Sequence, residues 1–457
     1  MKKHLISLGL TALLSLMLVQ PVLSQPGILE QYIREGLQQN LGIQQQQLEV
    51  EQKQLGARRA RANYLPEVDF AATYLLADGG RMIRFPVGDL LNPVYNTLND
   101  MVDGTPFPRD LENVEEQFLP NNFHDTRIRV RQPLFNTNIH YGARIAESEI
   151  AIQEAQLGVR QAEILRDVSV AYYQHMQTRA LIEIYDSTQV LLEELLRFNE
   201  KLVRYDKATR DVISSVEFEL AELAGDRAEA VLQRERSKAY FNQLLHRPLE
   251  EAIIVDSAAR QLPDRPAATS GTLRTRSLQN RSELQQLEKA IATNDLLTEL
   301  RRKDRLPQLG LELNAGFQGF GYDFNGEQSY YSLGFSLNWN LFGGQRKQLR
   351  IQEAEVEQLQ TRTRYEEARE QVQVQVIQAY YDLQAAWEKY EARGAALKSA
   401  RESFRIIGKR YENQQVLLVE LLDARTRYTN AQIQSAIARY DIKIKEAELL
   451  RAVGSQQ

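Results

Sequence analysis

The chain has 457 residues, of which 26% are charged and 43% hydrophobic, and its formal net charge is −5. These values argue against a bundle of membrane-spanning helices, which needs runs of about 20 apolar residues, and 56 basic against 61 acidic residues give no indication of a nucleic-acid partner. The absence of cysteine excludes disulfides, thiolate metal sites and thiol catalysis.

Residues 1–24 have the pattern of a secretory signal peptide. Two lysines precede a short apolar run, and Val22 and Ser24 suit signal-peptidase cleavage. An anchoring membrane helix is the alternative, but the run is short and Pro21 follows it directly. We therefore expect an exported bacterial protein whose mature chain begins near Gln25.

The remainder of the chain contains the same unit twice. Leu65-Pro66 recurs as Leu306-Pro307. Ala171-Tyr172-Tyr173-Gln174 matches a segment that begins 208 residues later at Ala379, and Phe198 and Tyr205 match Phe404 and Tyr411, 206 residues later. The near-constant separation of the motifs in the long helices indicates an internal duplication. Each copy reads as helix, strand, loop, strand, very long helix, turn and helix.

The first copy is expected over 25–248 and the second over 273–457, with a linker over 249–272 between them. In the first copy we predict strands at about 67–76 and 124–134, a long loop over 77–123, and helices at 27–63, 143–204 and 212–246. In the second copy we predict strands at about 308–318 and 330–341 and helices at 273–304, 345–411 and 417–452.

The predicted strands alternate strictly between apolar and polar residues. Over 331–341, odd positions are aromatic or aliphatic, whereas even positions are Ser, Gly or Asn. Such alternation over about ten residues is typical of a transmembrane β-barrel strand, and a soluble sandwich with one wet face is the alternative. Four strands cannot close a barrel, because closure needs about eight or more, so two or three chains must share one.

The long predicted helices lack proline and carry apolar residues at heptad spacing. Leu191, Leu195, Phe198, Leu202 and Tyr205 are separated by four, three, four and three residues. This spacing is typical of coiled-coil packing. The wide polar face of these helices would also suit the lining of a water-filled tube, but the sequence alone favours an ordinary solvated surface.

Together these features resemble the TolC-like outer-membrane efflux protein family over roughly 27–453. Leu65-Pro66 and Leu306-Pro307 before strands, residues 340–344 between a strand and a long helix, and the tip segment 411–424 carry the resemblance. It implies a fold that is mainly α with a transmembrane β part. In this fold the duplicated strand–strand–long-helix unit forms a homotrimer, whose 12-stranded β-barrel is continuous with a periplasmic α-helical coiled-coil tube.

The resemblance implies a passive, gated channel of a tripartite efflux or type I secretion system, exporting small molecules or proteins from periplasm to exterior. The channel would lie in bacterial outer-membrane lipid with a large periplasmic portion. Its partners would be a periplasmic adaptor (membrane fusion) protein and an inner-membrane pump driven by protons or ATP. No cofactor is expected. A periplasmic coiled-coil adaptor or structural protein of an export machine is the alternative, and an enzyme such as a secreted hydrolase lacks a supporting constellation.

The resemblance also places a pore constriction at the tips of the helical hairpins. Tyr411 would end the long helix, and Glu420 and Asp423, three residues apart, lie on one face of the next helix. Tyr205 and Asp211 hold the equivalent places in the first copy. A threefold axis would turn each carboxylate into a ring that favours cations; the simpler interpretation is solvated charges near a helix N-terminus.

The chain departs from the family pattern in three ways. The glycine usual in the turn after the tip tyrosine is missing, with Gln414 near that place. Val416 stands where some members carry a latch arginine. The loop over 77–123 is unusually long, and could cap the pore, bind a ligand or shield the barrel.

Three arginines, Arg127, Arg129 and Arg131, alternate with two apolar residues in a strand of the first copy. If the apolar residues face lipid, the arginines face the lumen of the barrel. We expect structural pairing with Asp69 or Glu312 in preference to a role in ion selectivity.

Overall fold

The computed structural model describes residues 27–256 and 261–454. The predicted signal peptide, residues 1–24, lies outside the described residues. Among the residues described, no helix combines the length and the apolar character that crossing a membrane requires.

The chain folds into two compact units. Among the described residues, one contains 27–48, 155–256, 261–285 and 367–454, and the other contains Glu49–Glu154 and Gln286–Glu366. Each unit therefore draws on both copies of the duplicated sequence. The reason is that strands of the two copies pair with each other, and that their helices pack together where the helical hairpins turn.

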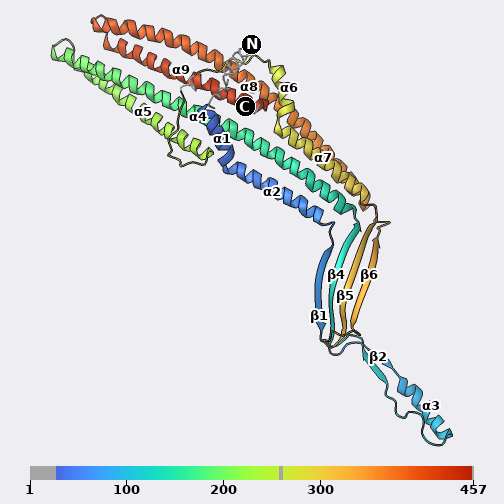
Figure 1. The fold of residues 1–457 in the computed structure, drawn as a ribbon. Coiled ribbons are helices and arrows are strands. Elements are labelled where there is room, and N and C mark those ends of the chain that lie inside the picture. Colours follow the sequence, from blue (N-terminus) through green and yellow to red (C-terminus); the bar gives the residue numbers. More distant parts are fainter. Residues whose placement is uncertain (1–26, 257–260, 455–457) are drawn as a thin grey trace, which may run out of the picture. The chain divides into compact units, whose positions relative to one another are not determined.

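The second unit contains a four-stranded antiparallel sheet (Figure 1). Its strands lie in the order β1 (Glu67–Leu75), β4 (Phe123–Phe135), β5 (Gln308–Phe320) and β6 (Ser329–Asn338). The central pair, β4 with β5, joins the two copies. β1 and β6 are the edges, and β6 ends three residues before the predicted end at 341.

The register of the sheet gives it two unlike faces. Arg129 lies between Asp69 of β1 and Asn314 of β5. Leu313, on the opposite face, lies between Val130 and Leu333. The apolar face is uncovered in the single chain. Its most exposed members include Phe70 (73%), Tyr331 (82%) and Phe335 (75%).

The segment predicted as a loop over 77–123 has secondary structure of its own. β2 (Met82–Phe85) pairs antiparallel with β3 (Val114–Gln117), and α3 spans Val87–Met101. Two asparagines of α3 hold the returning chain by paired amide hydrogen bonds. Asn92 exchanges bonds of 2.8 and 2.9 Å with the backbone of Leu111, and Asn99 exchanges bonds of 3.0 and 3.2 Å with that of Phe107.

The remaining helices of the chain follow the duplicated order. They are α1 (Ile28–Gln39), α2 (Leu41–Ala62), α4 (Thr137–Arg204), α5 (Asp211–Leu244), α6 (Ser270–Asn280), α7 (Ser282–Lys303), α8 (Arg346–Glu412) and α9 (Leu418–Val453). α4 begins six residues earlier than predicted, since the Asn136 side chain accepts a 2.9 Å hydrogen bond from the Asn138 backbone N–H.

Two helices predicted as continuous, 27–63 and 273–304, are each broken, the first at Asn40 and the second at Arg281. Both residues have extended backbone, with ψ of 123° and 119°. The Asn40 side chain donates a 2.8 Å hydrogen bond to the Leu244 carbonyl, at the end of α5. The Arg281 side chain donates a 3.1 Å bond to the Ala452 carbonyl, at the end of α9. Each break therefore satisfies a helix-terminal carbonyl that would otherwise be buried without a partner.

The first unit has three apolar cores. One lies among α1, α4 and α5 around Tyr172 and Phe241, and another among α6, α8 and α9 around Val376 and Ile442. The third lies where both helical hairpins turn, and contains Leu192, Val216, Tyr411, Leu418, Leu421 and Leu422. Of the heptad residues predicted from the sequence, Leu195 and Phe198 pack against this third core.

Candidate functional site

Tyr411, Glu420 and Asp423, three of the predicted constriction residues, lie at the turn between α8 and α9. Tyr411 is the most buried of them. Its side chain is 7% exposed and its hydroxyl donates a 2.6 Å hydrogen bond to the Asn199 amide oxygen on α4. The Asn199 amide nitrogen in turn donates to the Leu195 carbonyl at 2.8 Å, which fixes the orientation of the amide. Burial raises the pKa of Tyr411, so its hydroxyl stays protonated as the donor. Tyr411 therefore fastens the second hairpin to the first.

Tyr205 and Tyr411 were expected to be equivalent, and the structure shows that they are not. Tyr205 is 71% exposed and follows the last residue of α4, whereas Tyr411 is still inside α8. The structure thus brings Tyr411, but not Tyr205, into the contact between hairpins.

Both long helices end in the same type of turn. Asp206 and Gln414 have φ of 55° and 56°. In each case the following N–H reaches back five residues, from Lys207 to Leu202 and from Gln415 to Arg410, with N–O distances of 2.8 Å. This left-handed C-cap usually favours glycine. Gln414 therefore occupies the place of the glycine whose absence the sequence revealed, at a cost in backbone strain.

The carboxylates expected at the constriction are exposed. Glu420 accepts a 3.4 Å hydrogen bond from the Leu417 N–H at the start of α9, and Asp423 forms a 2.8 Å ion pair with Arg427 one turn later. Asp211 is the first residue of α5, and its carboxylate accepts a hydrogen bond from the Thr209 hydroxyl. Glu420 and Asp211 therefore lie in first turns, where a helix dipole favours negative charge, whereas Asp423 lies in the following turn of α9.

Two contacts at the same turns were missed by the sequence analysis. Arg425, on α9, is 5% exposed and forms an ion pair with Glu219 of α5. Asn199, which holds Tyr411, is fully buried. The only sequence signal was a polar residue beside an apolar heptad position. Val416, where a latch arginine was considered, is half-buried against the third core.

The three strand arginines lie on the polar face of the sheet, and each has an acidic partner. Arg131 contacts Asp69 at 2.8 Å, Arg129 contacts Glu312 at 3.5 Å, and Arg127 contacts Asp125 at 3.1 Å. Asp69 and Glu312 are the partners that the sequence suggested. This face is therefore strongly polar but locally balanced in charge.

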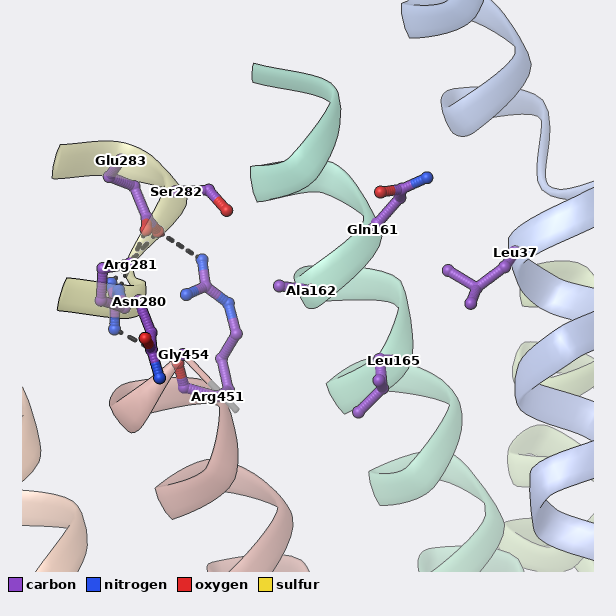
Figure 2. A pocket seen from close by; sticks show the side chains of 10 residues that line it. All are labelled: Leu37, Gln161, Ala162, Leu165, Asn280, Arg281, Ser282, Glu283, Arg451 and Gly454. Atoms are coloured by element: carbon purple, nitrogen blue, oxygen red, sulfur yellow. Dashed lines mark hydrogen bonds and ion pairs between the residues drawn. The ribbon is translucent and has the colours of Figure 1, made fainter. Parts of the chain in front are cut away.

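A cavity of about 290 Å³ lies beside the helix break at Arg281 (Figure 2). Glu283 accepts ion pairs from Arg281 at 2.9 Å and from Arg451 at 2.5 Å, and Leu37 and Leu165 form part of the opposite wall. Burial opposes ionisation of Glu283, but the two guanidinium groups hold its pKa below the ordinary value. The cluster ties the end of α9 to the start of α7.

The described residues contain no group of three or more His, Asp or Glu side chains arranged to hold a metal ion. His175 is buried against the Ser237 hydroxyl at 3.3 Å, and burial lowers its pKa to about 4. His124 contacts the Gln328 side chain at 2.8 Å. Both histidines act as packing residues in the structure.

The chain is similar to known outer-membrane proteins. Residues 273–455 match the family model described as outer membrane efflux protein. The outer-membrane channel OprN is 18% identical, with a TM-score of 0.74 over 93% of this chain and 90% of that one. The CmeC outer membrane channel of Campylobacter jejuni is 15% identical, with a TM-score of 0.74 over 93% of this chain and 85% of that one. The MtrE outer membrane channel of Neisseria gonorrhoeae, solved in an open state, is 17% identical, with a TM-score of 0.72 over 93% and 88%.

No curated protein matches the sequence of the chain. The solved structures share the fold of the chain at low sequence identity, and the family model matches the sequence of its second copy. The predicted resemblance is therefore confirmed: the chain is similar in sequence over residues 273–455, and in fold over nearly its whole length, to the TolC-like outer-membrane efflux proteins.

Proposed function

We propose that the chain is the outer-membrane channel of a tripartite efflux or type I secretion system. The observation that carries this proposal is the four-stranded sheet, which has one exposed apolar face, one charged face and two open edges. In water such a face would favour aggregation. In a bilayer the apolar face would contact lipid, and the charged face would line a water-filled lumen.

The open edges support a homotrimer. Unpaired backbone groups cost several kcal/mol each in hydrocarbon, so a sheet in a membrane must close on itself. Three copies would give a barrel of 12 strands, within the range of known barrels, whereas one copy gives four. The charged rows of Arg131, Asp69 and Glu312 would then encircle the lumen.

The helical hairpin turns would form the gate at the periplasmic end. Tyr411 and Arg425 each fasten one hairpin to the other, and these contacts would have to break if the hairpins separate. On a threefold axis, Glu420 and Asp423 would form two acidic rings, with Asp211 and Tyr205 exposed at the neighbouring turn. The chain would act with a periplasmic adaptor and an inner-membrane pump, which would supply the energy of export.

Membrane fractionation and planar bilayers test the proposal. The full-length precursor, expressed in a Gram-negative host, should yield a mature protein that remains in the outer membrane after carbonate extraction. In mild detergent it should have the mass of three chains, and in bilayers it should give discrete conductance steps. Release by carbonate as a monomer would instead identify a periplasmic adaptor or structural protein.

A further inference from the structure

The open edges of the sheet identify a surface for a second copy of the chain. Within the part of the chain that the structure describes, β1 pairs only with β4, and β6 only with β5. We infer that β1 of one copy pairs antiparallel with β6 of the next, in the register that places Ala71 opposite Asn338. This inference rests on the shared barrel of the proposed function, and adds the residues that meet there.

The internal duplication supplies the register. Pro66, which precedes β1, recurs 241 residues later as Pro307, before β5. Phe135, which ends β4, recurs 207 residues later as Phe342. These two separations therefore relate each strand of the first copy to its counterpart in the second.

The pairing inside each copy tests these separations independently. Glu67 of β1 lies opposite Arg131 of β4. The counterpart of Glu67, 241 residues later, is Gln308, and the counterpart of Arg131, 207 residues later, is Asn338. These two counterparts are paired in the structure. The two copies therefore use the same register between their own strands.

The same relation gives the pairing between chains. In the contact between copies within one chain, Arg131 of β4 lies opposite Glu312 of β5. The counterpart of Arg131 in the second copy, 207 residues later, is Asn338. The counterpart of Glu312 in the first copy, 241 residues earlier, is Ala71. A barrel that repeats the internal contact therefore sets Asn338 opposite Ala71 of the next chain.

The side chains brought together are chemically matched. Apolar positions meet apolar positions, and polar positions meet polar ones: Trp339 opposite Phe70, Phe335 opposite Tyr74, Ser336 opposite Thr73 and Asn340 opposite Asp69. Aromatic pairs and Ser–Thr pairs stabilise neighbouring strands. A shift by one residue would place apolar side chains opposite polar ones. A shift by two in either direction would leave neither aromatic pair.

The end of β6 gives a further reason for this arrangement. β4 continues beyond its last β1 partner, Arg131, to Phe135, and there it is held by β5 alone. In the single chain β6 stops at Asn338, where its β5 partners end. The segment after it is exposed, with Phe342 at 87%. Residues 68–70 of the next chain would hold this segment and extend β6 as β5 extends β4.

Disulfide trapping tests the register directly, because the chain contains no cysteine of its own. The test pairs are Ala71→Cys with Asn338→Cys and, on the other face, Ala72→Cys with Leu337→Cys. Alternate antiparallel pairs are closely spaced, so one of the two is in the favourable position. The matched controls, Ala71→Cys with Ser336→Cys and Ala72→Cys with Phe335→Cys, are two residues out of register. Their diagonal separation of about 7–8 Å strains a disulfide.

Oxidation of full-length protein in outer membranes should convert at least one test pair into covalent trimers on non-reducing denaturing gels. The matched control should yield at least about fivefold less, because its Cα atoms lie at the limit that a disulfide can bridge. Each double variant is first shown to be trimeric in reductant. If a double variant fails to assemble, co-expressed Ala71→Cys and Asn338→Cys single variants provide the same test, with a covalent dimer as the product.

Stronger cross-linking by a control than by its test pair would overturn the register. A parent protein that is trimeric, but whose test pairs and mixed single variants give no cross-link, would overturn it as well and leave the channel function intact. A parent protein that is monomeric in mild detergent would overturn the proposed function together with this inference.

Discussion

The hydrogen bond between Tyr411 and Asn199 is predicted to hold the two helical hairpins of each chain together. Replacing Tyr411 by Phe removes the hydroxyl but keeps the ring, which packs against Phe198 at a centroid distance of 6.0 Å. The Asn199 amide oxygen is then left in a fully buried position without its donor. Such an unsatisfied buried acceptor costs about 1–3 kcal/mol.

This loss sets the expected change in gating. If the bond exists only in the closed state, about 1–3 kcal/mol raises the ratio of open to closed channels by roughly 5- to 150-fold per chain. Single-channel recording in planar bilayers measures that ratio as open probability. Influx of a large antibiotic into cells provides a second readout.

Tyr205→Phe is the matched control, because this tyrosine lies at the corresponding turn of the first copy but is 71% exposed. It should leave open probability unchanged. In a double-mutant cycle, Asn199→Ala should add little to Tyr411→Phe, since both remove the same bond. Equal open probability for Tyr411→Phe and the parent channel, in a variant of normal trimer content, would refute the reasoning.

The other predictions concern charge, backbone strain and pH. Replacing Glu420 and Asp423 together by Ala should reduce cation preference and block by divalent cations in planar bilayers, and unchanged selectivity would remove both from the constriction. Gln414→Gly should relieve the strain of the left-handed backbone at this position and raise the free energy of unfolding by about 0.5–1 kcal/mol. A lower midpoint of thermal unfolding would show that the backbone at Gln414 is not strained. The pKa of Glu283 is lower in the folded chain than in the unfolded chain, so its ionised carboxylate stabilises the fold. This stabilisation is fully present above the ordinary glutamate pKa and is lost as the pH falls through the folded-state pKa. Glu283→Gln should therefore flatten the acid limb of the stability profile, and an unaltered limb would exclude this contribution.

The strands were predictable because their pattern is local. Side chains alternate between faces with a period of two, so the sequence over 331–341 already separates the apolar face from the polar one. The partners Asp69 and Glu312 followed from the same reasoning, because opposite charges on neighbouring strands stabilise each other.

The helix breaks were not predictable, because their cause lies far away in sequence. Asn40 and Arg281 sit in polar helical segments that a local pattern continues without interruption. Each is fixed by a carbonyl at the end of another helix, Leu244 or Ala452, about 170–205 residues further along the chain. For the same reason, the burial of Asn199 and Arg425 could not be inferred from their neighbours.

The two copies of the duplicated unit are alike in one part of the chain and different in another, and the physical demands on each part explain this. A sheet that closes through repeated copies must present the same register at every contact, and the pairs Glu67 with Arg131 and Gln308 with Asn338 keep that register. A gate needs contacts that can break between unlike hairpins. There the copies differ, with Tyr411 buried against Asn199 and Tyr205 exposed to solvent. The similarity of the two copies in the strands would allow the barrel to close. Their difference at the turns would allow one hairpin to move while the other stays in place.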